Sequence, residues 1–328
     1  MAQLESFLSR RLLGQEEAVA EFSSAMLRAE CGPRRPGRLR AFVLLLGPTG
    51  TGKTEMVRLT AEFLYGSSAS DRLARFDMGE YQHADSVKRL LGAPDQPPLL
   101  GQAIQRLNAL GGGILLLDEI EKAFPDLLTA LLSFDSARST MFDGTTHDLS
   151  ALVVVLTSNL GAAEAARMEN SGYSAITRKL RHAAEERFRK EGLARFTAVI
   201  CMNALRFGTQ ARIAERLLEQ ELALQSAHLR RWLGASPAVV TFLVSRGFSP
   251  DLGARHIRNC VERHVAEALR PALFAPPGPA PATGEVGDLW ASGLWLEIEN
   301  DALHAAPLRP TQPLLCPTQP PPNPAPGP

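Results

Sequence analysis

The feature that most constrains the fold is a short apolar run leading directly into a glycine-rich loop. Residues 42–46 (FVLLL) are continuously hydrophobic, which predicts a strand buried on both faces of a sheet. Residues 47–54 (GPTGTGKT) follow at once, and an amphipathic helix is expected over 55–65. A strand, a loop of this pattern and a helix in this order predict a phosphate-binding loop.

Each residue type in this loop has a physical role in holding phosphate. Glycines let backbone N–H groups approach an anionic oxygen, and the helix that begins here points its positive dipole end at the same place. Lys53 is long enough to reach terminal phosphates, and the Thr54 hydroxyl is a ligand for Mg²⁺. The expected nucleotide-binding residues are Gly47, Pro48, Thr49, Gly50, Thr51, Gly52, Lys53 and Thr54. The alternative is a glycine-rich turn with a surface lysine, which the flanking strand and helix disfavour.

Composition narrows the class of protein. The chain has 328 residues, of which 45% are hydrophobic, so it is long enough for two domains with a large core. Its formal net charge is zero, so no overall field favours nucleic acid or an anionic membrane. The basic run Arg34, Arg35, Arg38 and Arg40 lies among prolines and glycine. This run is interpreted as a solvated loop in preference to a polyanion site.

The cysteines and the N-terminus indicate a cytoplasmic protein. The four cysteines, Cys31, Cys201, Cys260 and Cys316, show no metal-site spacing, and we expect free thiols in a reducing compartment. The first residues lack the apolar core of a signal peptide, and no apolar run approaches the length of a membrane span. We therefore expect neither a membrane nor a nucleic acid as a partner.

Strand-like and helical segments alternate in the first two thirds of the chain. The expected strands are 42–46, 73–77, 113–117, 151–157 and 198–202. A helix is predicted over 14–30, with Val19, Phe22 and Met26 on one face. This alternation predicts an α/β fold, in which a mostly parallel sheet is flanked by helices. Ligands of such sheets bind at the carboxyl ends of the strands.

After about residue 206 the pattern becomes mainly helical. A helix is expected over 209–231, where the apolar positions are Ile213, Leu217, Leu218, Leu222 and Leu224. A second helix follows Ser236, and a third runs from about 251 to 269 and is ended by prolines from Pro271 onward. A short strand is expected over 294–298. The predicted domains are 1–206, 207–303 and a proline-rich disordered tail over 304–328.

Two strand ends carry the residues expected to act on the phosphates. The run 114–117 ends in Asp118 and Glu119. If this strand lies beside the first, Asp118 emerges next to Thr54 and holds Mg²⁺, while Glu119 polarises a water for attack. Asn159 follows the strand 151–157, where its amide would orient that water and sense the γ-phosphate. The alternatives are an acidic loop and a helix-capping asparagine.

These motifs resemble the second ATPase module of Clp-type AAA+ chaperones and unfoldases. The resemblance covers residues 9 to about 303, through RLLGQEEAV, GPTGTGKTE, FDMGEY, LLLDEIEKAFPDLL and LTSNLG. It implies an AAA+ phosphate-loop domain and a small, mainly helical C-terminal lid that form a ring, usually a hexamer, with ATP between subunits. Leu13, in the first of these motifs, is expected at the nucleotide.

The resemblance also assigns two arginines. Arg195 occupies the position of the arginine finger that reaches a neighbouring subunit's ATP, and Arg255 matches the lid arginine that contacts the γ-phosphate. The frame around Arg195 departs from the family, with Ala194 and Thr197 where Asn and Asp are usual. A surface arginine and a structural helix-start arginine are the respective alternatives.

The segment 92–101 departs most from the family. Family members that thread polypeptides carry a longer loop with aromatic residues here, whereas this loop has none. Leu99 and Leu100 either grip substrate or pack onto the domain, and the sequence does not decide between these. The second pore segment, 139–148, lacks basic residues, and we expect no peptidase-docking loop and no substrate domain before residue 9.

The leading hypothesis is an ATP-hydrolysing ring, working alone or with a full-length Clp partner, that remodels, unfolds or disaggregates protein substrates. The alternative is a non-threading, torsin-like protein in which ATP controls assembly or partner binding and hydrolysis is slow. A DNA-handling AAA+ protein fits the fold but not the neutral charge.

Overall fold

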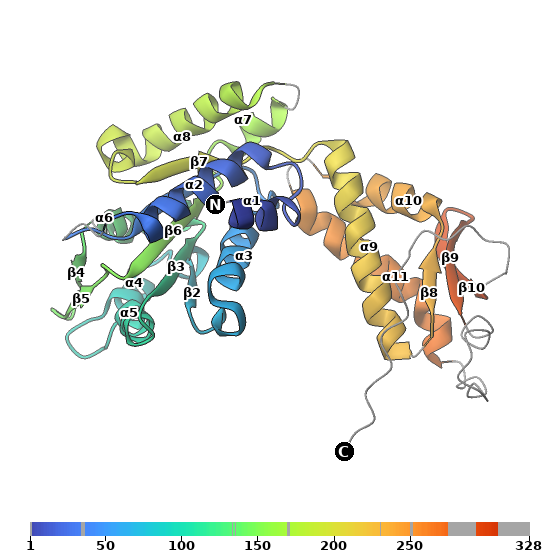
Figure 1. The fold of residues 1–328 in the computed structure, drawn as a ribbon, viewed down its shortest axis with the longest axis horizontal. Coiled ribbons are helices and arrows are strands. Elements are labelled where there is room, and N and C mark those ends of the chain that lie inside the picture. The colour runs from blue at the N-terminus through green and yellow to red at the C-terminus, as the bar shows by residue number, and fades with distance from the viewer. Residues whose placement is uncertain are drawn as a thin grey trace, which may run out of the picture. The chain divides into compact units, whose positions relative to one another are not determined.

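The structure is a computed structural model that describes residues 2–33, 37–132, 134, 136–168, 171–229, 231–249, 252–274 and 293–307. The chain divides into two compact units, Met1–Leu205 and Arg206–Pro328. Each unit has its own apolar core, and each is described by itself (Figure 1). Arg34, Arg35, Cys316 and the predicted tail beyond residue 307 lie outside the described residues.

The first unit is built on a five-stranded parallel sheet in the order β2-β3-β6-β1-β7. The strands are β1 (Ala41–Leu46), β2 (Leu73–Asp77), β3 (Gly113–Asp118), β6 (Leu152–Ser158) and β7 (Ala198–Cys201). The five predicted strands and the α/β class are confirmed. The condition named for Asp118, that the first and third strands are neighbours, is not met, because β6 lies between β1 and β3.

Helices cover both faces of this sheet, which explains its continuous apolar runs (Figure 1). Phe42, Leu44 and Leu46 belong to one core layer, whereas Val43 and Leu45 belong to the other. The second layer includes residues of α1 (Ala2–Ser9), α2 (Glu16–Cys31) and α3 (Lys53–Tyr65). The first layer includes residues of α4 (Ala84–Leu91), α5 (Leu99–Ala109), α6 (Pro125–Leu132), α7 (Ala162–Arg167) and α8 (Tyr173–Leu193).

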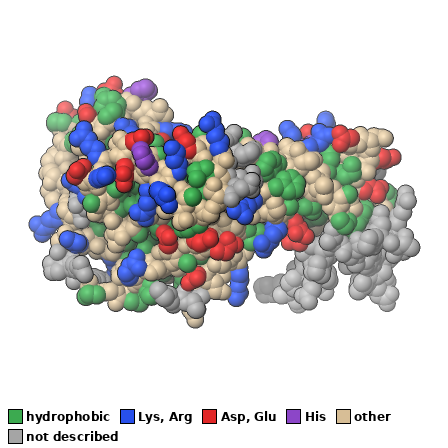
Figure 2. All heavy atoms as spheres, turned by 90° about the horizontal axis from the view of Figure 1, so that it is seen from above, with side chains coloured by type: hydrophobic (Ala, Val, Ile, Leu, Met, Phe, Trp, Pro, Cys, Tyr) green, Lys and Arg blue, Asp and Glu red, His purple; other side chains and the backbone are tan. Residues whose placement is uncertain are grey.

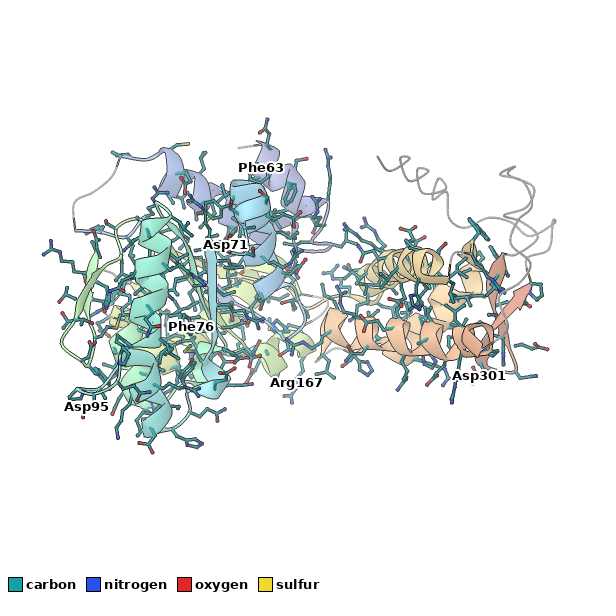
Figure 3. All side chains as sticks on the ribbon, turned by 90° about the horizontal axis from the view of Figure 1, so that it is seen from below. Phe63, Asp71, Phe76, Asp95, Arg167 and Asp301 are labelled. Atoms are coloured by element: carbon teal, nitrogen blue, oxygen red, sulfur yellow. The ribbon has the colours of Figure 1, made fainter. Side chains whose placement is uncertain are left out.

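The structure differs from the sequence prediction in the two segments expected to be loops. One of them forms a small hairpin, and a helix begins within the other. Strands β4 (Arg138–Thr140) and β5 (Thr146–Asp148) pair antiparallel within the expected second pore segment. Helix α5 begins at Leu99, inside the expected loop 92–101. Asp95 lies in the short connection that remains between α4 and α5 (Figure 3).

The second unit packs three helices with a three-stranded sheet. The helices are α9 (Phe207–Leu229), α10 (Pro237–Gly247) and α11 (Gly253–Phe274), and the strands are β8 (Leu233–Ala235), β9 (Leu294–Glu299) and β10 (Ala302–Pro307). Leu217, Leu218 and Leu222 are buried as their spacing predicts, but Leu224 is 64% exposed. A leucine at the edge of the apolar face of a helix need not be buried in the core.

Two predicted boundaries in this unit differ from the structure. Helix α11 continues through Pro271 to Phe274. Pro271 lies in the last turn, where its missing N–H removes a single intrahelical bond. Strand β10 occupies residues 302–307, so the residues expected to open the tail pair with β9 instead. In the described part of the chain, no helix is both long and apolar enough to cross a membrane.

The described cysteines are free thiols, as the sequence predicts. Cys31 is exposed, whereas Cys201 and Cys260 are buried. Burial raises the pKa of the Cys201 thiol to about 11, and it also raises the pKa of Cys260. Both buried thiols are therefore protonated and unreactive at neutral pH.

Candidate nucleotide-binding site

The glycine-rich loop connects β1 to α3 and packs tightly against its surroundings. Gly47 has φ 151° and Gly52 has φ 102°, both in the region that favours glycine. A Cβ atom at Gly47 would lie 2.7 Å from the carbonyl O of Met202, and one at Gly52 would lie 2.9 Å from Cδ2 of Leu12. The loop conformation therefore requires glycine at both positions.

The predicted lysine and asparagine meet at the mouth of the loop. Lys53 is 6% exposed, and its Nζ donates hydrogen bonds to the carbonyl O atoms of Gly47 and Pro48, each at 2.7 Å. It also donates to Oδ1 of Asn159 at 2.8 Å. Because β1 and β6 are parallel neighbours, their carboxyl ends bring these two residues together.

Asp118 accepts hydrogen bonds from three side chains at the end of β3. The Thr54 hydroxyl lies 3.0 Å from each carboxylate oxygen, and the Thr157 hydroxyl donates to Oδ1 at 2.5 Å. Arg75, on β2, donates to Oδ2 from Nη2 at 2.7 Å and from Nε at 3.1 Å. Thr54 and Asp118 thus meet although β6 separates their strands. A hydroxyl next to a carboxylate is a donor set that suits Mg²⁺.

Glu119 occupies a strained backbone position directly after β3. Its φ of 58° and ψ of 50° lie in the left-handed region, which is uncommon for a residue with a side chain. Its N–H donates to the Thr157 hydroxyl at 3.0 Å. The carboxylate is 19% exposed and forms an ion pair with Lys122, which raises the pKa of the Lys122 ammonium.

Glu121 determines the orientation of the Asn159 side chain. Its Oε1 accepts hydrogen bonds from the backbone N of Asn159 at 3.1 Å and from Nδ2 at 3.0 Å. A carboxylate accepts and an ammonium donates, so Glu121 requires the amide NH₂ on its own side and Lys53 requires the carbonyl oxygen on the other. Asn159 consequently presents Oδ1, an acceptor, towards the loop.

Sequence reasoning missed Arg75, Thr157, Glu121 and Lys122. Thr157 and Arg75 lie within strands, and only the strand order shows that both face Asp118. Glu121 and Lys122 follow the predicted carboxylate pair within the same motif. Their charge and their closeness to Asp118 in the sequence were the signals that could have identified them.

Leu13 lies in the segment between α1 and α2 and is half-buried. Its neighbour Leu12 is the residue whose side chain lies against Gly52 of the loop. Gln15, two residues further on, exchanges hydrogen bonds with the backbone of Asn203 at 2.8 and 2.9 Å. This N-terminal segment is thus anchored beside the loop.

The two predicted arginines lie in different units. Arg195 follows α8, is exposed, and donates from Nη1 to the carbonyl O of Leu132 at 3.2 Å. The helix before it is kinked at Arg189, where φ is 58°. Arg255 is exposed in the first turn of α11, in the second unit. The roles of Arg195 and Arg255 stay predictions.

A second candidate surface joins the connection after α4 to the β4–β5 hairpin. Leu100 is fully buried, whereas Leu99 is 38% exposed, so the two leucines do not act as a pair. Phe142, in the hairpin turn, is 52% exposed, and its N–H donates to the carbonyl O of Leu91 at 2.8 Å. The sequence interpretation considered this hairpin for basic residues and overlooked its aromatic one.

In this parallel sheet, the strand ends bring together a glycine-rich loop, a lysine and a hydroxyl–carboxylate pair. This arrangement defines a phosphate-loop nucleotide-binding protein. Residues 39–199 match the family described as AAA domain (Cdc48 subfamily), and residues 209–275 match the C-terminal, D2-small domain of ClpB protein. The chain belongs to the Clp-type AAA+ family.

Curated relatives share this assignment. The chain is 36% identical over 279 residues to Chaperone protein ClpB 1 of Nostoc sp. (strain PCC 7120), a match that covers 82% of the chain and 31% of the relative. It is 34% identical over 316 residues to Chaperone protein ClpB of Bacillus anthracis, which covers 92% of the chain and 34% of the relative. The chain thus spans about a third of the length of these relatives.

Proposed function

We propose that the chain binds ATP with Mg²⁺ and uses its hydrolysis to remodel, unfold or disaggregate protein substrates. The observation that carries the proposal is the meeting of Lys53, Thr54, Asp118 and Asn159 at one end of the sheet. Carboxylate, hydroxyl, ammonium and amide are the groups that phosphoryl transfer requires from a protein.

Each residue then has a chemical role. Lys53 exchanges its bonds to the loop carbonyls for phosphate oxygens, and Thr54 and Asp118 hold Mg²⁺, which when bound neutralises charge on the phosphates. Glu119 accepts a proton from the attacking water. The Glu119 carboxylate also forms an ion pair with Lys122. Asn159, held by Glu121, accepts a hydrogen bond from the same water.

The assembly is proposed from the family. The chain works as a cytoplasmic ring, usually a hexamer, in which Arg195 reaches a neighbouring subunit's ATP and Arg255 contacts the γ-phosphate within its own subunit. We also propose a full-length Clp partner as a component of such a ring. The relatives named chaperones favour this function over the torsin-like alternative.

The substrate-contacting surface that we propose consists of Leu99 and Phe142. It replaces the pair of leucines considered from sequence, because Leu100 belongs to the core. The exposed ring of Phe142 supplies the flat apolar area that the segment 92–101 lacks.

The test of the proposed chemistry is Glu119→Gln, which removes the base and retains the size of the side chain. We expect unchanged ATP affinity, a decrease in hydrolysis of about 10²- to 10⁴-fold, and accumulation of an ATP-bound ring. Binding is measured by calorimetry, turnover by phosphate release, and assembly by light scattering. The matched control is Asp71→Asn, an exposed carboxylate (Figure 3), which should behave as wild type. Unchanged hydrolysis in Glu119→Gln would contradict the proposal.

A further inference from the structure

A cavity of about 810 Å³ lies in the first unit, at the end of the sheet where the strands begin and opposite the end that carries the nucleotide-binding loop. Its lining comes from the end of α2, from segments that precede β1, β6 and β7, and from the β4–β5 hairpin (Figure 1). The sheet is parallel, so the amino-terminal strand ends meet here, whereas loop 47–54 follows the carboxyl end of β1. The volume is within the range of ~300–1,000 Å³ that is typical of ligand pockets.

Positive charge dominates this cavity, which we call the arginine pocket. Its arginines are Arg28, Arg38, Arg40 and Arg138. Arg40 forms an ion pair with Glu30 at 3.0 Å, and Arg138 stands opposite Asp148 in the hairpin. Arg38 makes no side-chain hydrogen bond or ion pair with any residue that the structure describes. Among the described residues, four arginines of the lining thus stand against two carboxylates, an excess of two positive charges, and the Arg28 guanidinium donates to the Ser24 hydroxyl at 2.7 Å.

This cluster is not the basic run that the sequence shows. Arg38 and Arg40 belong to that run, but Arg28 comes from α2 and Arg138 from β4. Elsewhere, the face in Figure 2 shows basic and acidic side chains interspersed, as a formal net charge of zero leads one to expect. Because arginines that are far apart in the sequence line one cavity, a solvated loop does not explain the whole cluster.

The remaining lining defines the chemistry of a ligand. Thr197 Oγ1 accepts a hydrogen bond from the Phe42 N–H at 3.0 Å, so its own O–H can donate to a bound anion. The apolar lining is Ala29, Pro33, Leu39 and Ala137. The described lining contains no aromatic ring on which a nucleotide base could stack.

We propose that the arginine pocket binds an acidic peptide segment of a partner protein. Guanidinium groups bind carboxylates through paired hydrogen bonds, and the aliphatic lining accommodates side chains between the acidic ones. A free phosphate satisfies the charge but leaves the apolar lining unused. The pocket shares no residue with the proposed catalytic groups, so binding there is separable from ATP hydrolysis.

The test uses the full chain and a fluorescein-labelled peptide of alternating Glu and Leu, with anisotropy as the readout. We expect saturable binding that weakens with salt and falls about tenfold in Arg38→Ala with Arg138→Ala, because two exposed charge contacts are lost. The matched control removes two exposed arginines of the second unit, Arg212→Ala with Arg258→Ala, and should bind as wild type. Both variants should retain the wild-type melting temperature and ATPase rate.

Three results would overturn the proposal. The pocket variant and the control could bind the acidic peptide equally well. A peptide of alternating Lys and Leu could bind as tightly as the acidic one. Tripolyphosphate could bind at this pocket by calorimetry while the acidic peptide does not, which would assign the pocket to small phosphate anions.

Discussion

At the scale of single residues, the nucleotide-binding site is held by side chains that constrain one another. Thr54, Thr157 and Arg75 all donate to Asp118, so its carboxylate has a fixed orientation. Glu121 fixes Asn159 in the same way. Its second oxygen, Oε2, is buried without a hydrogen-bond partner in the described part of the chain. A buried unsatisfied oxygen is costly, so the two hydrogen bonds that Oε1 accepts must offset that cost.

Glu121 variants test this orientation. Glu121→Ala removes the acceptor, so the Asn159 amide can rotate and hydrolysis should fall roughly 10- to 100-fold in kcat with a smaller change in KM for ATP. Glu121→Gln keeps an amide oxygen at the same place and should retain most of kcat. Steady-state ATPase kinetics measure both. If the Ala variant keeps the wild-type kcat, or if Gln fails to rescue it, Glu121 does not position Asn159.

The sequence predicts the local part of this site. The loop, Glu119 and Asn159 follow strands directly, and Asp118 ends a strand, so a motif reveals them. Arg75 and Thr157 take their roles from strands that neighbour each other only in space. Without the strand order, no pattern along the chain connects either residue with Asp118.

At the scale of elements, long apolar runs predict strands better than short ones. Strands β1, β3 and β6 are visible because every residue in them is buried, whereas β2 and β7, at the two edges of the sheet, are only partly buried. Strands β4, β5 and β8 span three residues each, too short for an alternating pattern to be recognised. Helix α5 begins earlier than its loop-like sequence indicates, because burial of Leu100 fixes its first turn.

The exposed and buried leucines of α5 should respond differently to truncation. Leu99→Ala with Phe142→Ala removes exposed apolar area, so the protein should keep its stability and basal ATPase but lose ATP-dependent recovery of an aggregated reporter enzyme. Leu100→Ala empties a core position and should lower the free energy of unfolding by about 2–5 kcal/mol. Denaturant unfolding separates the two effects. Full recovery activity in the double variant would exclude this surface from substrate handling.

At the scale of the whole molecule, the nucleotide-binding loop and the tryptophans lie in different compact units. The loop lies in Met1–Leu205, whereas Trp232, Trp290 and Trp295 all follow residue 206. Tryptophan fluorescence therefore reports on the second unit alone, and circular dichroism reports on both.

Thermal unfolding should reveal these units as two transitions. We expect fluorescence to follow only one of them, and ADP with Mg²⁺ to raise the midpoint of the other, since a ligand stabilises the unit that binds it. Lys53→Ala should abolish the shift and leave the fluorescence transition unchanged. One coincident transition by both probes would show that the units unfold cooperatively.

The left-handed backbone of Glu119 bears on how this enzyme can evolve. A residue with a side chain pays about 1–2 kcal/mol for this conformation, and glycine does not. On the role proposed for Glu119, replacement by glycine would therefore relieve strain while abolishing turnover. Under that proposal, selection for stability alone would favour an inert protein, and the carboxylate would persist at this position only while catalysis is under selection.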